Sequence, residues 1–298
     1  MAIALVILPI FALILLGWLL KLRAGVSEEG WRGLERLIYF VFFPALLFHS
    51  LSRAVIDFTA ALPMLLTGLA VTLAGMGLGT LSRFLFHDPP LVFASAFQCS
   101  FRFNSYVGLA VAGALHGQAG IAAIGLLMGF IVPLANVASV AMLARHGEAD
   151  WLREILGNPL ILATAGGVGF ALLGWSLPDL LAQTLAMLAQ ASLPLGLVVV
   201  GAGLRLDSLS HAPGHLWYGV VVKLLALPAL AWWLGRALGL DAPGFEIALL
   251  FAALPTSTVA YVLAVRMGGD GRVTAAQVAL TTLLSMLTLP LWLAGARG

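Results

Sequence analysis

Ten apolar segments follow one another along the chain, and each is close to the length of about 20 residues with which a helix crosses a membrane. They comprise residues 3–22, 37–52, 60–82, 90–112, 119–143, 158–174, 180–202, 214–236, 244–265 and 273–294. Hydrophobic residues make up 61% of the 298 residues and charged residues only 9%, whereas soluble domains carry about 25% charged residues. Within lipid every backbone polar group needs a partner in the protein, and a helix provides it. The sequence therefore predicts an all-α membrane protein with ten transmembrane helices.

The basic residues outside these segments are divided unevenly between the two sides of the membrane. If the chain starts outside, the cytoplasmic side holds Lys21, Arg23, Arg32, Arg36, Arg83, Arg145, Arg153, Arg205, Arg266 and Arg272. The opposite side holds only Arg53, Arg236 and Arg297. Short loops rich in Lys and Arg remain in the cytoplasm. We therefore expect both termini on the non-cytoplasmic side.

Several classes of function are disfavoured by the composition. The net charge of +2 is too small to indicate a nucleic-acid partner, and the Cys and His residues form no metal-binding pattern. The single cysteine, Cys99, excludes an intrachain disulfide. A membrane enzyme such as an intramembrane protease needs a catalytic Asp pair, a Ser/His arrangement or HExxH within the segments, and none is visible. All 13 acidic residues lie in loops or at segment edges, Glu246 being the deepest, which disfavours a proton relay through a buried carboxylate.

The two halves of the chain repeat each other in residue spacing. Three pairs of motifs match at offsets of 150, 153 and 151: Pro44 to Asp57 with Pro194 to Asp207, "SRFLFHDPP" with "GRALGLDAP", and Asn104 to Gly117 with Pro255 to Gly268. Residues 1–149 and 150–298 are therefore expected to form two five-helix repeats. Because five is an odd number, the second repeat must enter the membrane inverted, as is typical of secondary transporters.

The fourth and ninth segments are predicted to be discontinuous helices. Pro255 stands in the middle of the ninth, where it removes an amide donor and breaks the helix. Thr256, Ser257 and Thr258 follow it and can cap the second half-helix. The repeat places Asn104 and Ser105 of the fourth segment opposite Pro255 and Thr256, and a second half-helix can start at Ser105.

Two half-helices that start near the middle of the membrane would present partial positive charges to a common region. Arg102 stands beside one of these starts. Backbone amides, an arginine and hydroxyl groups together favour an anion site, in particular for a carboxylate. Alternatively, Arg102 reaches the membrane interface or donates to carbonyls freed by the break, and Asn104 is only a helix cap.

Three other polar residues inside the segments are candidate supporting residues. Gln98 is a candidate cavity residue, and Asn136 either contacts the fourth segment or forms a helix–helix hydrogen bond. Lys223 is either a counter-charge or reaches a water-filled cavity. No cofactor is expected. Coupling to Na+ or H+ stays open, because unwound carbonyls and hydroxyls can hold sodium.

Five stretches resemble those of the auxin efflux carrier family in its short bacterial form, over nearly the whole chain. They are "FRFNSYVGLAVAGALHG", "PLANVASV", "NPLILATAGGVGFALLG", "LPLGLVVVGAGLRL" and "ALPTSTVAYVLAVRMGGDGRVTAAQVALTTLLSMLTLP". The resemblance implies a ten-helix fold akin to bile acid symporters and sodium/proton antiporters, in the bacterial inner membrane. Helices 4 and 9 would cross within a moving, elevator-type transport domain of helices 3–5 and 8–10. Helices 1, 2, 6 and 7 would form the scaffold, often as a homodimer.

The resemblance also implies a substrate class and one binding residue. Substrates in this family are organic anions such as indole acetate, malate or malonate, and the asparagine of the first crossover matches Asn104. The second crossover often has an asparagine after its proline, where this chain has three hydroxyl residues, which offer fewer donors. The leading hypothesis is an organic-anion carrier working by alternating access. The alternatives are a sodium-coupled symporter of the bile acid type and a membrane sensor that binds its ligand without transporting it.

Overall fold

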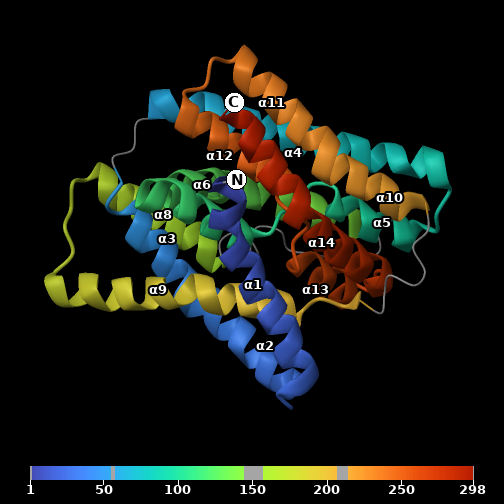
Figure 1. Cartoon of the computed structure of the whole chain (residues 1–298), viewed down its shortest axis with the longest axis horizontal. Coiled ribbons are helices and arrows are strands. Elements are labelled where there is room, and N and C mark those ends of the chain that lie inside the picture. Colours follow the sequence, from blue (N-terminus) through green and yellow to red (C-terminus); the bar gives the residue numbers. More distant parts are fainter. Residues whose placement is uncertain (1, 55–57, 144–156, 207–213, 298) are drawn as a thin grey trace. The chain divides into compact units, whose positions relative to one another are not determined.

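The computed structural model describes residues 2–54, 58–143, 157–206 and 214–297 (Figure 1). Within these residues all regular elements are helices. They are α1 (Ala2–Arg23), α2 (Glu28–Leu37), η1 (Ile38–Phe42), α3 (Phe43–Leu51), α4 (Phe58–Phe86), α5 (Pro90–Cys99), α6 (Ser105–Leu143), α8 (Pro159–Leu172), α9 (Asp179–Ala202), α10 (Gly214–Val221), η3 (Val222–Ala226), α11 (Leu227–Ala237), α12 (Ala242–Ala253), α13 (Val259–Arg266) and α14 (Gly271–Ala296). Asp57, Asp207, Arg145 and Arg153 lie outside the described residues.

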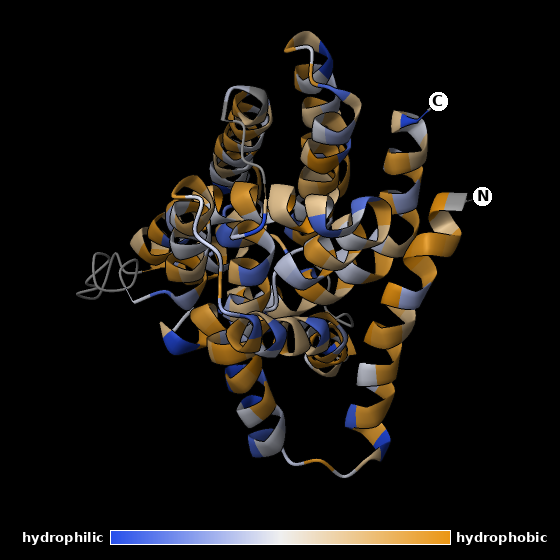
Figure 2. Cartoon of the chain, turned by 90° about the vertical axis from the view of Figure 1, so that its left-hand side faces the viewer, coloured by the Kyte–Doolittle hydropathy of each residue, from blue (hydrophilic) through white to orange (hydrophobic). Residues whose placement is uncertain are grey.

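Seven helical stretches of the described chain are long and apolar enough to cross a membrane, and their ribbons are predominantly hydrophobic (Figure 2). They are Ile3–Arg23, Glu28–Leu51, Ala61–Phe86, Ser105–Leu143, Asp179–Ala202, Gly214–Ala237 and Gly271–Ala296. Three shorter apolar helices are α5, α8 and α12. The chain is therefore an integral, all-helical membrane protein. Ten crossings stay a prediction, because α5, α8 and α12, which lie in the predicted fourth, sixth and ninth segments, are each too short to cross a membrane alone.

The boundary between the predicted fourth and fifth segments coincides with a kink inside α6. α6 is assigned as one stretch of 39 residues that contains the end of the fourth segment and the whole of the fifth. Gly117 interrupts it with a φ of 59°, a left-handed conformation that glycine adopts without a steric penalty. The kink thus lies between the two predicted segments, 90–112 and 119–143.

The helices belong to two compact units, each built from three stretches of chain. Unit 1 contains Met1–Ala61, Tyr106–Phe130 and Leu152–Gly203, and unit 2 contains Leu62–Ser105, Ile131–Trp151 and Leu204–Gly298. The predicted repeats, 1–149 and 150–298, divide the chain differently. A repeat is defined by similar sequence in two halves of the chain, whereas a unit is defined by which residues pack together. The repeats stay a prediction.

In unit 1, α9 packs against α1 and α3, and α3 also packs against α8. The contact between α1 and α9 depends on small residues, because a β-carbon on Gly17 would overlap the carbonyl of Val198 and one on Gly201 that of Ile14. Close backbone approach at small residues is a common way for membrane helices to associate.

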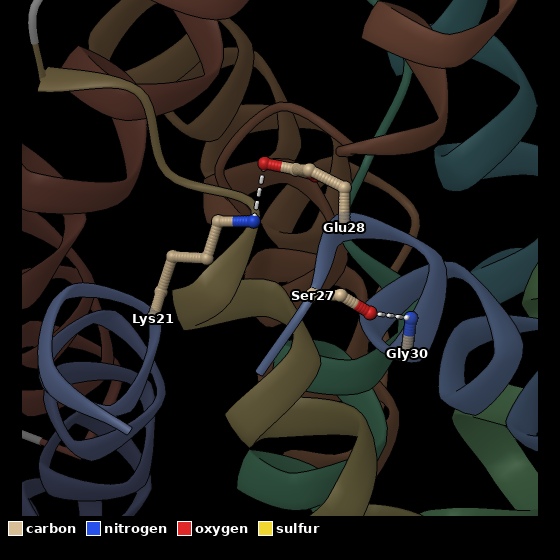
Figure 3. A network of polar contacts seen from close by, with 4 residues as sticks. All are labelled: Lys21, Ser27, Glu28 and Gly30. Carbon is tan, nitrogen blue, oxygen red and sulfur yellow. Dashed lines mark hydrogen bonds and ion pairs between the residues drawn. The ribbon is translucent and has the colours of Figure 1, made fainter. Parts of the chain in front are cut away.

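The turn between α1 and α2 is held by polar contacts of its own (Figure 3). Lys21 Nζ donates to Glu28 Oε1, and Ser27 Oγ accepts the amide of Gly30 at 3.1 Å as the N-cap of α2. A serine followed by two acidic residues is a typical start of a helix.

Two prolines follow turns of π-helix. Pro44 comes two residues after η1 in unit 1, and Pro228 two residues after η3 in unit 2. Proline has no N–H and its ring clashes with the carbonyl four residues before it, so the preceding turn widens. In unit 2 the indole of Trp292 donates to the carbonyl of Leu224 at 2.9 Å, which is the carbonyl that Pro228 leaves without an amide donor.

In unit 2 the acidic side chain of Glu246 is paired with an arginine. Glu246 of α12 accepts two hydrogen bonds of 2.7 Å from the guanidinium of Arg297, beyond the end of α14. Hydrogen bonding to this carboxylate raises the pKa of Arg297. Glu246 is therefore part of an ion pair at the edge of the unit.

Candidate functional site

The first candidate break separates α5 from α6. α5 ends at Cys99, α6 begins at Ser105, and the backbone between them is not helical. Two aromatic side chains anchor this stretch: Phe101 packs edge-on against Phe97 at 5.0 Å between centroids, and Phe103 packs against Phe251 of α12 at 4.6 Å. Buried aromatic contacts on both sides hold the backbone in its irregular path.

The second candidate break separates α12 from α13. α12 ends at Ala253 and α13 begins at Val259, with Pro255 between them. Ser257 Oγ accepts the amide of Val259 at 3.3 Å and so caps the second half-helix. Thr258 occupies the N-cap position but makes no capping hydrogen bond with its side chain. Of the three hydroxyl residues predicted as possible caps, only Ser257 caps α13 with its side chain, because Thr258 is already helical and Thr256 Oγ1 donates to the carbonyl of Cys99.

The two breaks are joined by hydrogen bonds within unit 2. The amide of Asn104 donates to the carbonyl of Pro255 at 2.9 Å, and Thr256 Oγ1 donates to the carbonyl of Cys99 at 3.1 Å. Gln98 Nε2 adds a third bond, to the carbonyl of Ala260 at 3.1 Å. Interrupted helices leave carbonyls and amides without helical partners, and away from water each must be satisfied within the protein. Each break supplies partners for the other.

The polar side chains at the breaks are buried. Arg102 is 7% exposed, Asn104 2%, and both Thr256 and Gln98 are fully enclosed. Neither break contains an acidic residue. A guanidinium is costly to bury, so its presence in an apolar part of a membrane protein is a recognised indication of a functional position.

The predicted site residues do not all meet. Hydrogen bonds bring together the segments that carry Gln98, Asn104, Pro255 and Thr256, and Arg102, Ser105, Ser257 and Thr258 adjoin them in the chain. Asn136, on α6, is half-buried, and Lys223 is buried in η3. In the described part of the chain no hydrogen bond connects Asn136 or Lys223 to either break.

One residue of the break region was not among the predicted site residues. Thr281 of α14 accepts the backbone amide of Thr256 through Oγ1 at 3.1 Å and donates through the same oxygen to the carbonyl of Gln277 at 2.7 Å. The sequence did contain a feature that could have identified Thr281. Polar residues recur at helical spacing in this apolar segment, and in the structure they are buried on α14: Gln277, Thr281, Thr282 and Ser285. Polar residues inside a membrane helix usually face protein rather than lipid.

The comparisons with known proteins indicate the family of the chain. Residues 134–293, more than half of the chain, match the model of a family described as membrane transport protein. A protein of Rhizobium meliloti (strain 1021) named "Putative malonate transporter" is 28% identical over 296 residues, which cover 95% of this chain and 92% of the relative. An "Uncharacterized transporter" of Methanothermobacter thermautotrophicus is 26% identical, with 96% of each chain covered. The "Uncharacterized transporter YfdV" of Escherichia coli (strain K12) is 25% identical over 96% of this chain and 95% of the relative.

These relatives are named as transporters, not as enzymes, and they match the chain over nearly its whole length. The matching family model and these relatives confirm the resemblance to the auxin efflux carriers. The chain belongs to the membrane transport protein family, that of the auxin efflux carriers, and is a membrane transporter of a small molecule.

Proposed function

We propose that this transporter carries small organic anions, in particular carboxylates, across the bacterial inner membrane by alternating access. The observation that carries the proposal is the pair of hydrogen-bonded breaks with the buried guanidinium of Arg102 beside them. Helix starts at Ser105 and Val259 contribute partial positive charge, and no acidic residue of either break opposes it. A negatively charged group suits these surroundings.

Within this proposal, Arg102 and Asn104 bind the anion, with Ser105, Ser257 and Thr258 as further donors. Pro255 and Thr256 hold the breaks together, since their carbonyl and hydroxyl already bond the opposite segment. The two segments are the crossed helices 4 and 9 of two inverted repeats. This is supported by the offset of 151 between Asn104 and Pro255, the two residues that the hydrogen bond joins.

The proposed movement is of the elevator type. Helices 3–5 and 8–10 would carry the anion past a scaffold of helices 1, 2, 6 and 7, in a homodimer with both chain termini outside the cytoplasm. The name of the relative from Rhizobium meliloti supports malonate as the first carboxylate to test.

Transport into proteoliposomes tests the assignment of the anion site. We expect Arg102→Ala to reduce malonate uptake by about tenfold to a hundredfold, because a hydrogen bond to a charged group contributes about 1.5–3 kcal/mol. Arg266→Ala, which removes an exposed arginine at the end of α13, is the matched control and should transport normally. Equal uptake by both variants would reject the anion site.

Asn104→Ala separates binding from capping. If the amide binds the anion, the variant needs more malonate for half-maximal uptake while its thermal stability stays close to that of the wild type. A loss of stability with an unchanged half-saturation concentration means that Asn104 is a structural cap.

A sodium-coupled symporter is a second candidate function, because the side-chain oxygen of Gln98 is available as a ligand for a cation. Gln98 Oε1 is buried, and no donor of the described residues lies within hydrogen-bond distance of it. Such side-chain oxygens are usual ligands of hard cations. Uptake that requires a sodium gradient would favour this reading. A sensor, by contrast, would bind malonate without any uptake.

A further inference from the structure

Lys223 is a buried cation that the proposed anion site does not use. It lies in η3, near the middle of the membrane-spanning stretch Gly214–Ala237, and is 2% exposed. Only one other lysine exists in the chain, Lys21, in the turn after α1. Ionisable residues buried inside membrane helices are rare, and they usually belong to a transport pathway or a proton site.

No hydrogen bond or ion pair connects the Lys223 ammonium to another side chain or carbonyl of the described residues. The widened turn does not need it, because Trp292 already donates to the Leu224 carbonyl that Pro228 leaves free. Lys223 is therefore not needed as a donor to that carbonyl.

The elements packed around η3 carry few groups that could balance its charge. These elements are α10, α11, α12 and α14. Their titratable or charged side chains are His215 and Tyr218 on α10, Arg236 on α11, Glu246 on α12 and Arg272 on α14. The acidic groups on or beside these elements all have other partners: Glu246 pairs with Arg297, and Asp88 with His215 at 3.0 Å. Asp241 and Asp270 cap α12 and α14 by accepting backbone amides. The protonated form of Lys223 therefore has no described counter-charge.

Lys223 and the second break are linked through the elements that pack against η3. η3 packs against α12, which leads into that break, and against α14, whose Thr281 binds the amide of Thr256. All of these elements belong to unit 2. In surroundings of low dielectric constant, charges influence each other over longer distances than in water. An anion bound at the breaks would thus stabilise a positive charge on Lys223.

We propose that Lys223 carries the coupling proton of this transporter, binding it together with the anion and releasing it when the anion leaves. The inference rests on the proposed anion site. The amine accepts one proton to become an ammonium, and no other bond changes. Arg102 cannot do this because a guanidinium keeps its proton at every physiological pH. The anion and the proton would then move together, without any buried carboxylate.

Binding-linked proton uptake tests this directly. Malonate binding to the purified transporter is measured by titration calorimetry in two buffers of different ionisation enthalpy, which gives the number of protons taken up. We expect net uptake in the wild type and in the control Lys21→Met. We expect none in Lys223→Arg, which still binds malonate because its charge is permanent. In Lys223→Met we expect weaker binding and no uptake.

The outcomes separate this inference from the proposed function. Malonate binding without proton uptake in the wild type, or unchanged uptake in Lys223→Arg, overturns the role of Lys223 and leaves the anion site intact. Absence of carboxylate binding and transport in the wild type rejects both. Lys223→Met should be at least as thermostable as the wild type, because it removes a buried charge without a partner. Acidification of proteoliposomes during malonate entry, lost in Lys223→Arg, is the corresponding transport measurement.

Discussion

The hydroxyl of Thr256 offers the sharpest test of the contact between the two breaks. Valine has nearly the same shape as threonine, so Thr256→Val removes the hydrogen bond to the Cys99 carbonyl without leaving a cavity. The backbone amide of Thr256 keeps its bond to Thr281, so the perturbation is confined to one interaction.

The expected magnitude follows from burial. Thr256 is 0% and Cys99 1% exposed, so the carbonyl left behind at the end of α5 has no access to water. A lost hydrogen bond costs about 0.5–1.5 kcal/mol, and leaving a buried polar group unsatisfied raises this to about 1–3 kcal/mol. If this whole free energy is lost from the conformation that transports the anion, the rate of malonate uptake drops by about five- to a hundredfold.

The assay compares two Thr→Val variants of unit 2. Thr80 lies on the exposed face of α4, and its hydroxyl donates only to the carbonyl of Met76 in the same helix, at 2.8 Å. Thr80→Val should therefore leave thermal stability and malonate uptake nearly unchanged, while Thr256→Val lowers both. Equal behaviour of Thr256→Val and Thr80→Val would refute the reasoning that the bond between the breaks stabilises the site.

Two further predictions concern stability. Gly201→Ala should destabilise the transporter by about 1–3 kcal/mol, because the new methyl group overlaps the carbonyl of Ile14. Gly169→Ala in α8, where a β-carbon meets nothing, should instead be neutral or stabilising by about 0.5–1 kcal/mol, and thermal unfolding in detergent distinguishes the two. Asp270→Ala should cost about 1 kcal/mol, because its carboxylate caps α14 by accepting two amides at 2.8 and 3.0 Å. A stability equal to that of the wild type would show that this cap contributes nothing.

Hydropathy was sufficient to identify a membrane protein built of helices, and local chemistry was sufficient to find both candidate breaks. The helix after the first break begins at Ser105, as its position after an asparagine predicted, and Pro255 lies in the second break. Both features depend on residues close in sequence: proline removes a donor, and short polar side chains favour helix starts.

The local sequence was less reliable for assigning roles to neighbouring residues of the same chemical type. Of the three hydroxyl residues after Pro255, Ser257 caps α13, Thr256 turns to the carbonyl of Cys99, and Thr258 is already helical. The sequence contains no information that separates these roles, because each depends on which acceptor or amide lies nearest in space.

The sequence by itself determined that this chain is a helical membrane protein with an arginine beside a predicted break, since long apolar runs favour membrane helices and a charge inside one is exceptional. Only the tertiary structure decided which groups satisfy one another. The bonds at the breaks join residues as far apart as Gln98 and Ala260, and Thr281 entered the site through packing of α14. The isolation of Lys223 also emerged only there, because a missing counter-charge is a property of neighbours brought together by folding.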